Sequence, residues 1–449
     1  MQSVIKNKSE LSITPLRAQA LDIIEAGIFQ VLPSTVMKHT VKFDSFNRIL
    51  SINNENFDVS KGRLFVIGGG KASGLMAQTL EEIISPENIT CGFVNCKDKD
   101  YRTSKIQIVE ASHPTPDQRG VRGVEQMLAL KDRYSINEND LVICLISGGG
   151  SALMPCPVDE ISLKDKQEIT RLLIEKGATI QEINAVRKHL SKIKGGRLGK
   201  FFSPTRVVSL IISDVIGNDL DTIASGPTVP DSTTFQDALA VLKNCDLLSK
   251  APRRIVDYLE NGFAGQKGET PKKLDNCHNF IIGDNRLALE AMISKAKEIG
   301  LKPCIVTAEQ KGDPTEMAKL RVKEILNRKY NDYDVLLIGG ETTPKLPDNH
   351  GKGGRNQHYA AVSMAALKDY PGEWVMAAVG TDGSDYIDGI AGAIVDINSL
   401  NTAIEKGIEI QSYLDRYDSF TLFEKIGNSL VKTGNTGTNV GDVAVYILK

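Results

Sequence analysis

The sequence lacks the features that mark membrane, secreted or nucleic-acid-binding proteins. No segment approaches the run of about 20 apolar residues that a transmembrane helix requires, and the N-terminus has no apolar core of a signal peptide. Its 54 basic and 56 acidic residues nearly cancel, which gives a formal net charge of −2 and no general attraction to nucleic acid or anionic membranes. We therefore expect a cytoplasmic protein without nucleic-acid or membrane partners.

Paired cysteines and standard nucleotide fingerprints are also missing. The seven cysteines form no Cys-x-x-Cys pair, which argues against a zinc site or a disulfide framework. The Walker pattern requires Ser or Thr after Gly-Lys, but Lys71 is followed by Ala72. The turn 68–74 lacks the third-glycine spacing of the dinucleotide motif, and the next predicted strand ends in 95–97 without an acid to bind a ribose. A Rossmann-type NAD site is therefore disfavoured.

The sequence does contain apolar strands that alternate with amphipathic helices of roughly 10–15 residues, a pattern typical of parallel sheets covered by helices. The glycine-rich, charged segment 262–275 has no apolar period and is the best linker candidate. We predict two α/β domains built on parallel or mostly parallel sheets with helices on both faces. They are a Rossmann-like domain over 1–261 and a second domain over 276–449.

Residues 181–199 contain an amphipathic helix with an unusual concentration of positive charge. Glycine favours the left-handed conformation that caps helices, so the pair Gly195-Gly196 is expected to end this helix. After Glu182 no acid interrupts the basic residues, which are Arg187, Lys188, Lys192, Lys194 and Arg197. One interpretation is an ordinary solvated basic face. The alternative is an anion site, which the neighbouring glycine turns favour.

Three glycine turns directly follow predicted buried strands, at 68–70, 148–150 and 339–340. Open parallel sheets bind their ligands at the carboxyl ends of the strands. Glycine there allows close approach of the backbone to a ligand, and a following helix offers free N–H groups to an anion. Three turns with the same placement favour an anion site more strongly than one.

Two cations and several carboxylates accompany these turns. Lys71 follows the first glycine turn, where its ammonium and the dipole of the predicted helix could both face an anion. Arg355 follows a glycine loop and opens a predicted helix, where a cation is unfavourable to the helix dipole. For Lys71 the alternative is an exposed lysine of the first turn. Loop carboxylates near phosphate-binding turns suit Mg²⁺, although each could be an ordinary solvated acid. The available carboxylates are Asp214, Asp219, Asp221, Glu341, Asp382 and Asp385. Of these we take Asp214, Glu341 and Asp382 as the metal ligands.

Ten segments together resemble the motifs of one enzyme family, the bacterial and eukaryotic glycerate 2-kinases. These segments are 69–73, 112–117, 147–153, 184–198, 213–219, 223–228, 339–343, 351–357, 381–383 and 436–440. The resemblance extends over nearly the whole chain, and the second half looks like the leucine-rich MOFRL domain of that family.

The resemblance implies ATP- and Mg²⁺-dependent phosphorylation of D-glycerate at its 2-hydroxyl, giving 2-phosphoglycerate and ADP, with the active site in the cleft between the two α/β domains. The proposed active-site lysine and arginine of the family map onto Lys71 and Arg355. A small hydroxy acid also needs a carboxylate anchor, for which the fork of Arg187 or Arg197 is well shaped. The full set of residues expected to bind substrate or phosphate is Gly69, Gly70, Ser147, Gly148, Gly149, Gly150, Ser151, Asn184, Arg187, Lys194, Arg197 and Gly340.

Two other functions stay open at this stage. An NAD(P)H-dependent hydroxypyruvate reductase, a label that such sequences have carried, is disfavoured by the missing dinucleotide fingerprint. A non-catalytic metabolite-binding protein of the same fold is disfavoured because Lys71, Arg355 and the carboxylates are all present. The sequence leaves open which glycine turn binds ATP, which binds glycerate, and whether the protein forms a homodimer.

Overall fold

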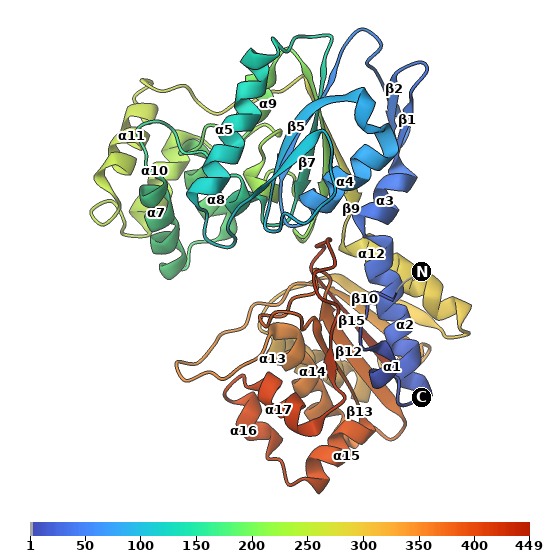
Figure 1. The fold of residues 1–449 in the computed structure, drawn as a ribbon. Coiled ribbons are helices and arrows are strands. Elements are labelled where there is room, and N and C mark those ends of the chain that lie inside the picture. Colours follow the sequence, from blue (N-terminus) through green and yellow to red (C-terminus); the bar gives the residue numbers. More distant parts are fainter. Residues whose placement is uncertain (1–2) are drawn as a thin grey trace. The chain divides into compact units, whose positions relative to one another are not determined.

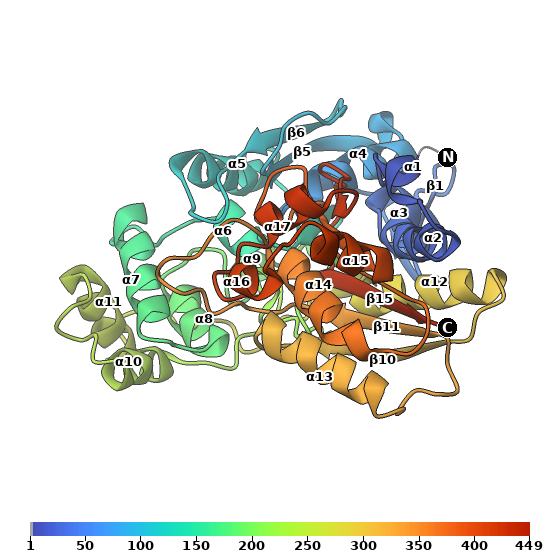
Figure 2. The ribbon, with the colours of Figure 1, turned by 90° about the horizontal axis from the view of Figure 1, so that it is seen from below.

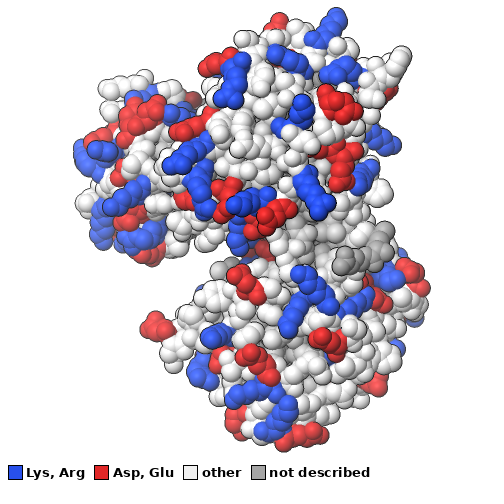
Figure 3. Space-filling model, in the orientation of Figure 1, with Lys and Arg blue, Asp and Glu red and all other residues white. Residues whose placement is uncertain are grey.

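The computed structural model describes residues 3–449, which form two compact units (Figure 1). The central unit is Val36–Ile282. The terminal unit combines the N-terminal segment up to Thr35 with Gly283–Lys449, so it contains both ends of the chain. The prediction of two α/β domains is confirmed. Figure 3 shows basic and acidic side chains interspersed over the visible face of each unit, as the small net charge leads one to expect.

The central unit is built on a six-stranded sheet whose order, β6-β5-β4-β7-β8-β9, is 3-2-1-4-5-6 along the chain. This is the strand order of dinucleotide-binding folds. The strands are β4 (Leu64–Gly69), β5 (Ile89–Cys96), β6 (Ile106–Glu110), β7 (Leu141–Ser147), β8 (Arg206–Ile212) and β9 (Cys277–Gly283). The strands from β6 to β8 are paired in parallel. Because the chain leaves β4 first toward β5 and later returns to β7 on its other side, the topological switch point lies between β4 and β7.

Helices cover this sheet, and a separate helical group packs around its own core. The sheet-covering and connecting helices are α4 (Ser73–Ile84), η1 (Pro86–Asn88), α5 (Gln118–Arg133), α6 (Gly150–Leu153), α9 (Arg197–Phe202) and η2 (Ile223–Ser225). The helical group is α7 (Leu163–Glu175), α8 (Ile180–His189), α10 (Phe235–Asn244) and α11 (Arg253–Phe263). These four helices lie side by side in both views (Figures 1 and 2) and bury Ile169, Val186 and Phe235 among them. A small antiparallel sheet of β1 (Val41–Asp44), β2 (Ile49–Ile52) and β3 (Glu55–Asp58) precedes β4.

The terminal unit contains a mixed sheet in the order β10-β11-β15-β12-β13-β14. Its strands are β10 (Pro303–Gln310), β11 (Val335–Gly340), β12 (Trp374–Gly380), β13 (Gly392–Asp396), β14 (Leu430–Val431) and β15 (Asp442–Leu448). Strands β10 and β11 are parallel, but β15 is antiparallel to both β11 and β12. The expectation of a mostly parallel sheet therefore holds for the central unit and needs correction here. The last strand of the chain inserts between two earlier strands, and its apolar pattern contains no information on its direction.

Two layers of helices cover the terminal sheet. One layer contains α1 (Lys8–Leu11), α2 (Pro15–Gln30) and α12 (Asn285–Glu298). The other contains α13 (Pro314–Leu326), α14 (Arg355–Ala366), η3 (Leu367–Asp369), α15 (Ile397–Glu405), α16 (Ile410–Leu414) and α17 (Ser419–Ile426). Within residues 3–449 no single helix is long and apolar enough to cross a membrane. Helix α2 passes that test only together with α3 (Pro33–Thr40), to which it is bent by 53°.

The unit boundaries differ from those expected from the sequence. Helix α2 packs beside α12, and its Arg17, only 1% exposed, donates to both carboxylate oxygens of Asp396 at 2.8 and 3.1 Å. The start of the chain therefore belongs with its end. Segment 262–275 is not where the units separate, because Glu269 hydrogen-bonds to the ring of His189 at 2.8 Å. The following strand, β9, completes the central sheet.

Candidate active site

The glycine turns after β4 and β7 lie side by side at the switch point of the central sheet. The backbone N–H of Lys71 donates to the carbonyl of Gly148 at 2.8 Å, and that of Ala72 donates to Oγ of Ser147 at 2.9 Å. Two of the three predicted turns are thus directly bonded to each other. An open parallel sheet binds its ligands at this position.

Close packing makes glycine necessary in both turns. Gly70 has a φ of +155°, and a Cβ at this position would lie 2.2 Å from Oγ of Ser147. Gly149 has a φ of +78°, and its Cβ would lie 2.9 Å from the ring of His113. The turns therefore present backbone rather than side chains, as an anion cradle requires. Of the other predicted residues, Gly69 ends β4 and Gly150 begins α6.

We expect Gly70→Ala to destabilise the protein far more than Gly177→Ala does. Gly177 also has a positive φ of +72°, but no atom lies within 4 Å of its Cβ position, so alanine there should cost about 1 kcal/mol of backbone strain. At Gly70 the clash with Ser147 adds to the strain, and the expected loss is at least about 3 kcal/mol. Urea unfolding measures both values. Equal losses of stability in the two variants would show that Gly70 is not packed against Ser147 as described.

Lys71 lies in the turn itself rather than in the first turn of the helix. Helix α4 begins at Ser73, and the half-buried Lys71 side chain passes Gly149, whose Cβ position is 3.3 Å from Cγ of Lys71. The ring of His113 borders the same position. Lys71 is therefore held between both glycine turns, which disfavours the alternative of a solvated helix-start lysine.

Helix α8 ends at His189, with Leu190 as its C-cap, and is therefore shorter than the helix ending at Gly195-Gly196 that the sequence predicts. Gly195 and Gly196 do adopt left-handed conformations, with φ of +57° and +77°, but they shape the following turn. The basic face is also not solvated throughout. Lys188 is 1% exposed and forms ion pairs with Asp221 and Asp231, so its role is structural.

The remaining basic residues of this segment divide into surface and buried groups. Lys192 is exposed and pairs with Asp159. Arg197 donates from a terminal nitrogen to the carbonyl of Gly268 at 3.2 Å, which gives the guanidinium a structural contact in the loop after α11. Lys194 is fully buried, and its Nζ donates to the carbonyl of Ala224 at 3.1 Å. Of these three residues, Lys194 is therefore the one whose ammonium contacts η2.

A hydroxyl–amide chain connects α6, η2 and α8 near Lys194. Oγ of Ser225 donates to Oδ1 of Asn184 at 3.0 Å and lies 2.8 Å from Oγ of Ser151. Ser225 and its neighbour Ala224 both have left-handed φ values, +61° and +51°. Strained backbone at non-glycine residues persists where the surroundings enforce it, and functional sites are common among such places. The predicted residues Asn184, Ser151 and Lys194 thus converge on one segment.

Sequence reasoning missed a further basic residue, Lys166 of α7. It is 4% exposed, and burial together with the charge of Arg187 lowers the pKa of its amine to about 8. Burial also lowers the pKa of Arg187, and burial with the charges of Lys166 and Arg187 holds the pKa of Lys194 well below its ordinary value. A signal was present, because Lys166 shares the buried face of α7 with Ile169 and Leu173. A lysine at core-facing helical spacing is unusual.

In the terminal unit, Arg355 opens α14 and is bound by acids. Its Nε and one terminal nitrogen donate to the two oxygens of Asp442 at 2.6 and 3.0 Å, and the other terminal nitrogen lies 2.7 Å from Glu341. Burial by itself would lower the pKa of Arg355, but Asp442 and Glu341 outweigh it and raise the pKa. Sequence analysis did not identify Asp442, which lies 87 positions away at the start of β15.

A carboxylate also occupies the N-terminus of α14. The buried side chain of Asp385 accepts hydrogen bonds from the backbone N–H groups of Asn356 and Gln357 at 3.0 and 2.8 Å. Burial raises the pKa of Asp385 to about 6 against the effect of these two bonds. The capping carboxylate offsets the positive end of the helix dipole, which explains how Arg355 is tolerated at this helix start.

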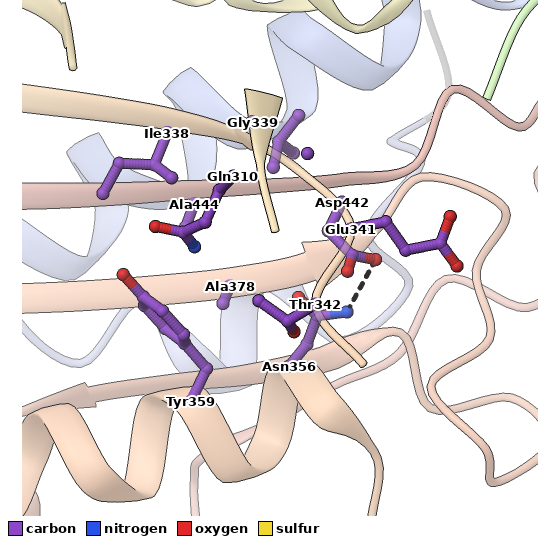
Figure 4. A pocket seen from close by; sticks show the side chains of 12 residues that line it. Gln310, Ile338, Gly339, Glu341, Thr342, Asn356, Tyr359, Ala378, Asp442 and Ala444 are labelled. Carbon is purple, nitrogen blue, oxygen red and sulfur yellow. Dashed lines mark hydrogen bonds between the residues drawn. The ribbon is translucent and has the colours of Figure 1, made fainter. Parts of the chain in front are cut away.

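A small cavity of about 20 Å³ lies beside this cluster (Figure 4), lined by residues that include Gly340, Asn356 and Asp442. Nδ2 of Asn356 donates to Asp442 at 2.9 Å across it, and the Glu341 side chain points away from it. Gly340, with a φ of +142°, is packed so closely that a Cβ would lie 2.3 Å from the carbonyl of Gln310. The space holds about one water molecule, which is too little for a nucleotide.

The three predicted metal ligands do not form a cluster within one unit. Asp214 follows β8 in the central unit, whereas Glu341 and Asp382 belong to the terminal unit. Glu341 is paired with Arg355, and Oδ1 of Asp382 accepts from the backbone N–H of Ser384 at 3.0 Å. Across the described residues 3–449, no group of three or more His, Cys, Asp or Glu side chains is arranged to hold a metal ion.

Comparisons with known proteins identify family models, similar sequences and a similar solved structure for this chain. A family model described as a domain of unknown function (DUF4147) matches residues 19–260, and the MOFRL family model matches residues 334–442. A protein named glycerate 2-kinase from Pyrococcus horikoshii is 38% identical, over 96% of this chain and 97% of that protein. A protein named D-glycerate 2-kinase from Thermotoga maritima is 34% identical, over 96% of this chain and 98% of that protein. The crystal structure of a glycerate kinase from Thermotoga maritima superimposes with a TM-score of 0.81 at 33% identity, covering 95% of this chain and 98% of that one.

Proposed function

The chain belongs to the glycerate kinase family that carries a MOFRL domain, and from this premise we propose that it transfers the γ-phosphoryl group of ATP to the 2-hydroxyl of D-glycerate. The products are 2-phosphoglycerate and ADP. The observation that carries the proposal is the position of Lys71 between two mutually bonded glycine turns at the switch point of the central sheet.

Phosphoryl transfer depends on positioning and charge neutralisation more than on covalent chemistry of the protein. The N–H of Gly70 already donates to the carbonyl of Asn95 at 3.1 Å, so the donors suited to phosphate oxygens are the backbone N–H groups of turn 148–150. The Lys71 ammonium supplies a positive charge at the same place. The 2-hydroxyl oxygen forms a bond to the γ-phosphorus and releases its proton to water, while the bond between the γ-phosphorus and the oxygen that bridges to the β-phosphate breaks and leaves its electron pair on ADP. Arg355 is the second cation that we assign to the charge of the transferred group. To act there, its guanidinium must donate to the phosphoryl oxygens as well as to Asp442 and Glu341.

Mg²⁺ is bound in most proteins by one or two carboxylates together with substrate phosphates rather than by an all-protein cage. Asp214 fits this role, because it follows β8 at the same sheet edge as Lys71 and offers only oxygen donors. Glu341 and Asp382 remain proposed ligands, but Glu341 would first have to leave Arg355. When bound, Mg²⁺ would supply neutralisation of the phosphate charge.

Incubation of the protein with ATP, Mg²⁺ and D-glycerate should release ADP and form 2-phosphoglycerate, which phosphorus NMR distinguishes from the 3-phospho isomer. Finding the 3-phospho isomer alone would refute the regiochemistry. Absence of any glycerate-dependent ADP release would refute the function. A parallel assay of NADH oxidation with hydroxypyruvate tests the reductase alternative, for which we expect no turnover.

A further inference from the structure

The central unit buries basic side chains that have no acidic partner. Lys166 on α7 is 4% exposed, Lys194 after α8 is fully buried, and Arg187 on α8 is half-buried. Among residues 3–449 none of them forms an ion pair with a carboxylate, and Nζ of Lys166 has no hydrogen-bond partner. Lys188, which lies on α8 beside Arg187, is buried too, but it forms ion pairs with two aspartates. Buried charges normally require such partners, because their desolvation is costly.

These cations are close enough to repel one another. Burial lowers the pKa values of Lys166 and Lys194, the positive charge on Arg187 lowers that of Lys166 further, and the charges of Lys166 and Arg187 lower that of Lys194 further. Nε of Arg187 lies 3.4 Å from Oγ1 of Thr170, which is one helical turn after Lys166 and on the same face of α7. In the described chain no terminal nitrogen of Arg187 hydrogen-bonds to the protein, so both are available to a ligand.

The cation cluster borders the glycine turn after β7. Lys194 binds the carbonyl of Ala224, and the Cβ of Ala224 lies 2.8 Å from the position of a Cβ on Gly150. Gln167, the neighbour of Lys166, donates to the carbonyl of Pro116 at 2.7 Å, in the loop that leads into α5. The cluster therefore lies at the ligand-binding edge of the sheet rather than in a remote part of the unit.

We propose that Lys166, Arg187 and Lys194 form the receptor for the carboxylate of the acceptor, a small 2-hydroxy acid. This inference rests on the proposed kinase function. An anionic group would supply the negative charge that the protein does not provide there, and a carboxylate matches the planar fork of arginine. The glycine turns and Lys71 remain for the phosphates. Holding the carboxylate also fixes the 2-hydroxyl one carbon away, whereas the 3-hydroxyl is one carbon further.

The test compares Lys166→Met with Lys164→Met, an exposed lysine on the same helix. Lys166→Met should raise the Kd for D-glycerate in calorimetry, and its KM in steady-state kinetics, by at least about tenfold, equivalent to about 1.4 kcal/mol. The KM for ATP should not change. The Tm should stay the same or rise, because the substitution removes an unpaired buried charge. Lys164→Met should behave as the wild type.

The pH dependence provides a readout that a structural role would not change. The Lys166 ammonium loses its proton as the pH rises through about 8, so the KM for glycerate should rise above that pH. The groups around it are Arg187, which lowers its pKa further, Lys194, whose own pKa is lowered by burial and by the charge of Lys166, and the thiol of Cys156, which opposes the effect of Arg187. In Lys166→Met the inflection near pH 8 should disappear, and the pKa of Lys194 should rise because the charge of Lys166 is removed.

An unchanged Kd for glycerate in Lys166→Met would overturn the inference. A rise in the KM for ATP without a change for glycerate would also overturn it, because it would assign the cluster to the nucleotide phosphates. Arg187→Lys is the second variant, and it should also weaken glycerate binding because an ammonium cannot replace the fork. If the wild type neither binds nor phosphorylates D-glycerate, the proposed function fails. If it does both while Lys166→Met is normal, only the carboxylate receptor fails.

Discussion

Replacing Lys71 with alanine should lower kcat by at least about a hundredfold, the scale of losing one preorganised charge-stabilising donor. The structure places Lys71 in the turn between β4 and α4, beside the second glycine turn. Its backbone N–H, which bonds to Gly148, is unaffected by the substitution. The Tm should therefore barely change, and steady-state kinetics with a thermal unfolding curve measures both quantities.

Lys200→Ala is a matched control, because Lys200 is an exposed lysine on α9 of the same unit. It should leave both kcat and Tm unchanged. A Lys71→Ala enzyme with near-normal kcat would reduce Lys71 to a bystander at the site. One that is inactive because it is unfolded would assign a structural role to Lys71.

Replacing Arg355 with lysine should lower kcat by at least about a hundredfold and also destabilise the fold. The loss of stability is expected because Arg355 binds Asp442 through two parallel hydrogen bonds and also pairs with Glu341. A lysine cannot reproduce that fork. Fully buried pairs lose 3–5 kcal/mol when broken, and for a side chain that is 30% exposed we expect about 2 kcal/mol.

Asp442→Asn separates the two roles of Arg355. This variant breaks the Arg355–Asp442 ion pair by removing the charge of the aspartate, and it leaves the guanidinium of Arg355 in place. Its loss of stability in urea unfolding should therefore be similar to that of Arg355→Lys. Its loss of kcat should be clearly smaller if Arg355 acts on the transferred phosphoryl group. Equal losses of kcat in the two folded variants would instead make Arg355 an anchor for β15 and its neighbours.

The sequence by itself determined the elements whose causes are local. The β4 and β7 turns are recognisable because glycines directly follow runs of apolar residues. The same alternation of strand and helix periods predicted two α/β domains, and Lys71 was identified by its place after one of these turns. Each of these conclusions depends on residues within a few positions of one another, where backbone geometry and hydrophobic periodicity are sufficient.

Only the tertiary structure decided which distant residues become partners. It inserted β15 antiparallel between β11 and β12, and it joined α2 to the far end of the chain through Arg17 and Asp396. It also separated Lys188, which has two aspartates, from Lys166, which has none. The sequence shows both residues as lysines on amphipathic helices and does not show which of them has acidic partners. The difference between a structural ion pair and an anion receptor is the burial of a charge relative to its partners, and that is set by contacts between residues far apart in the chain.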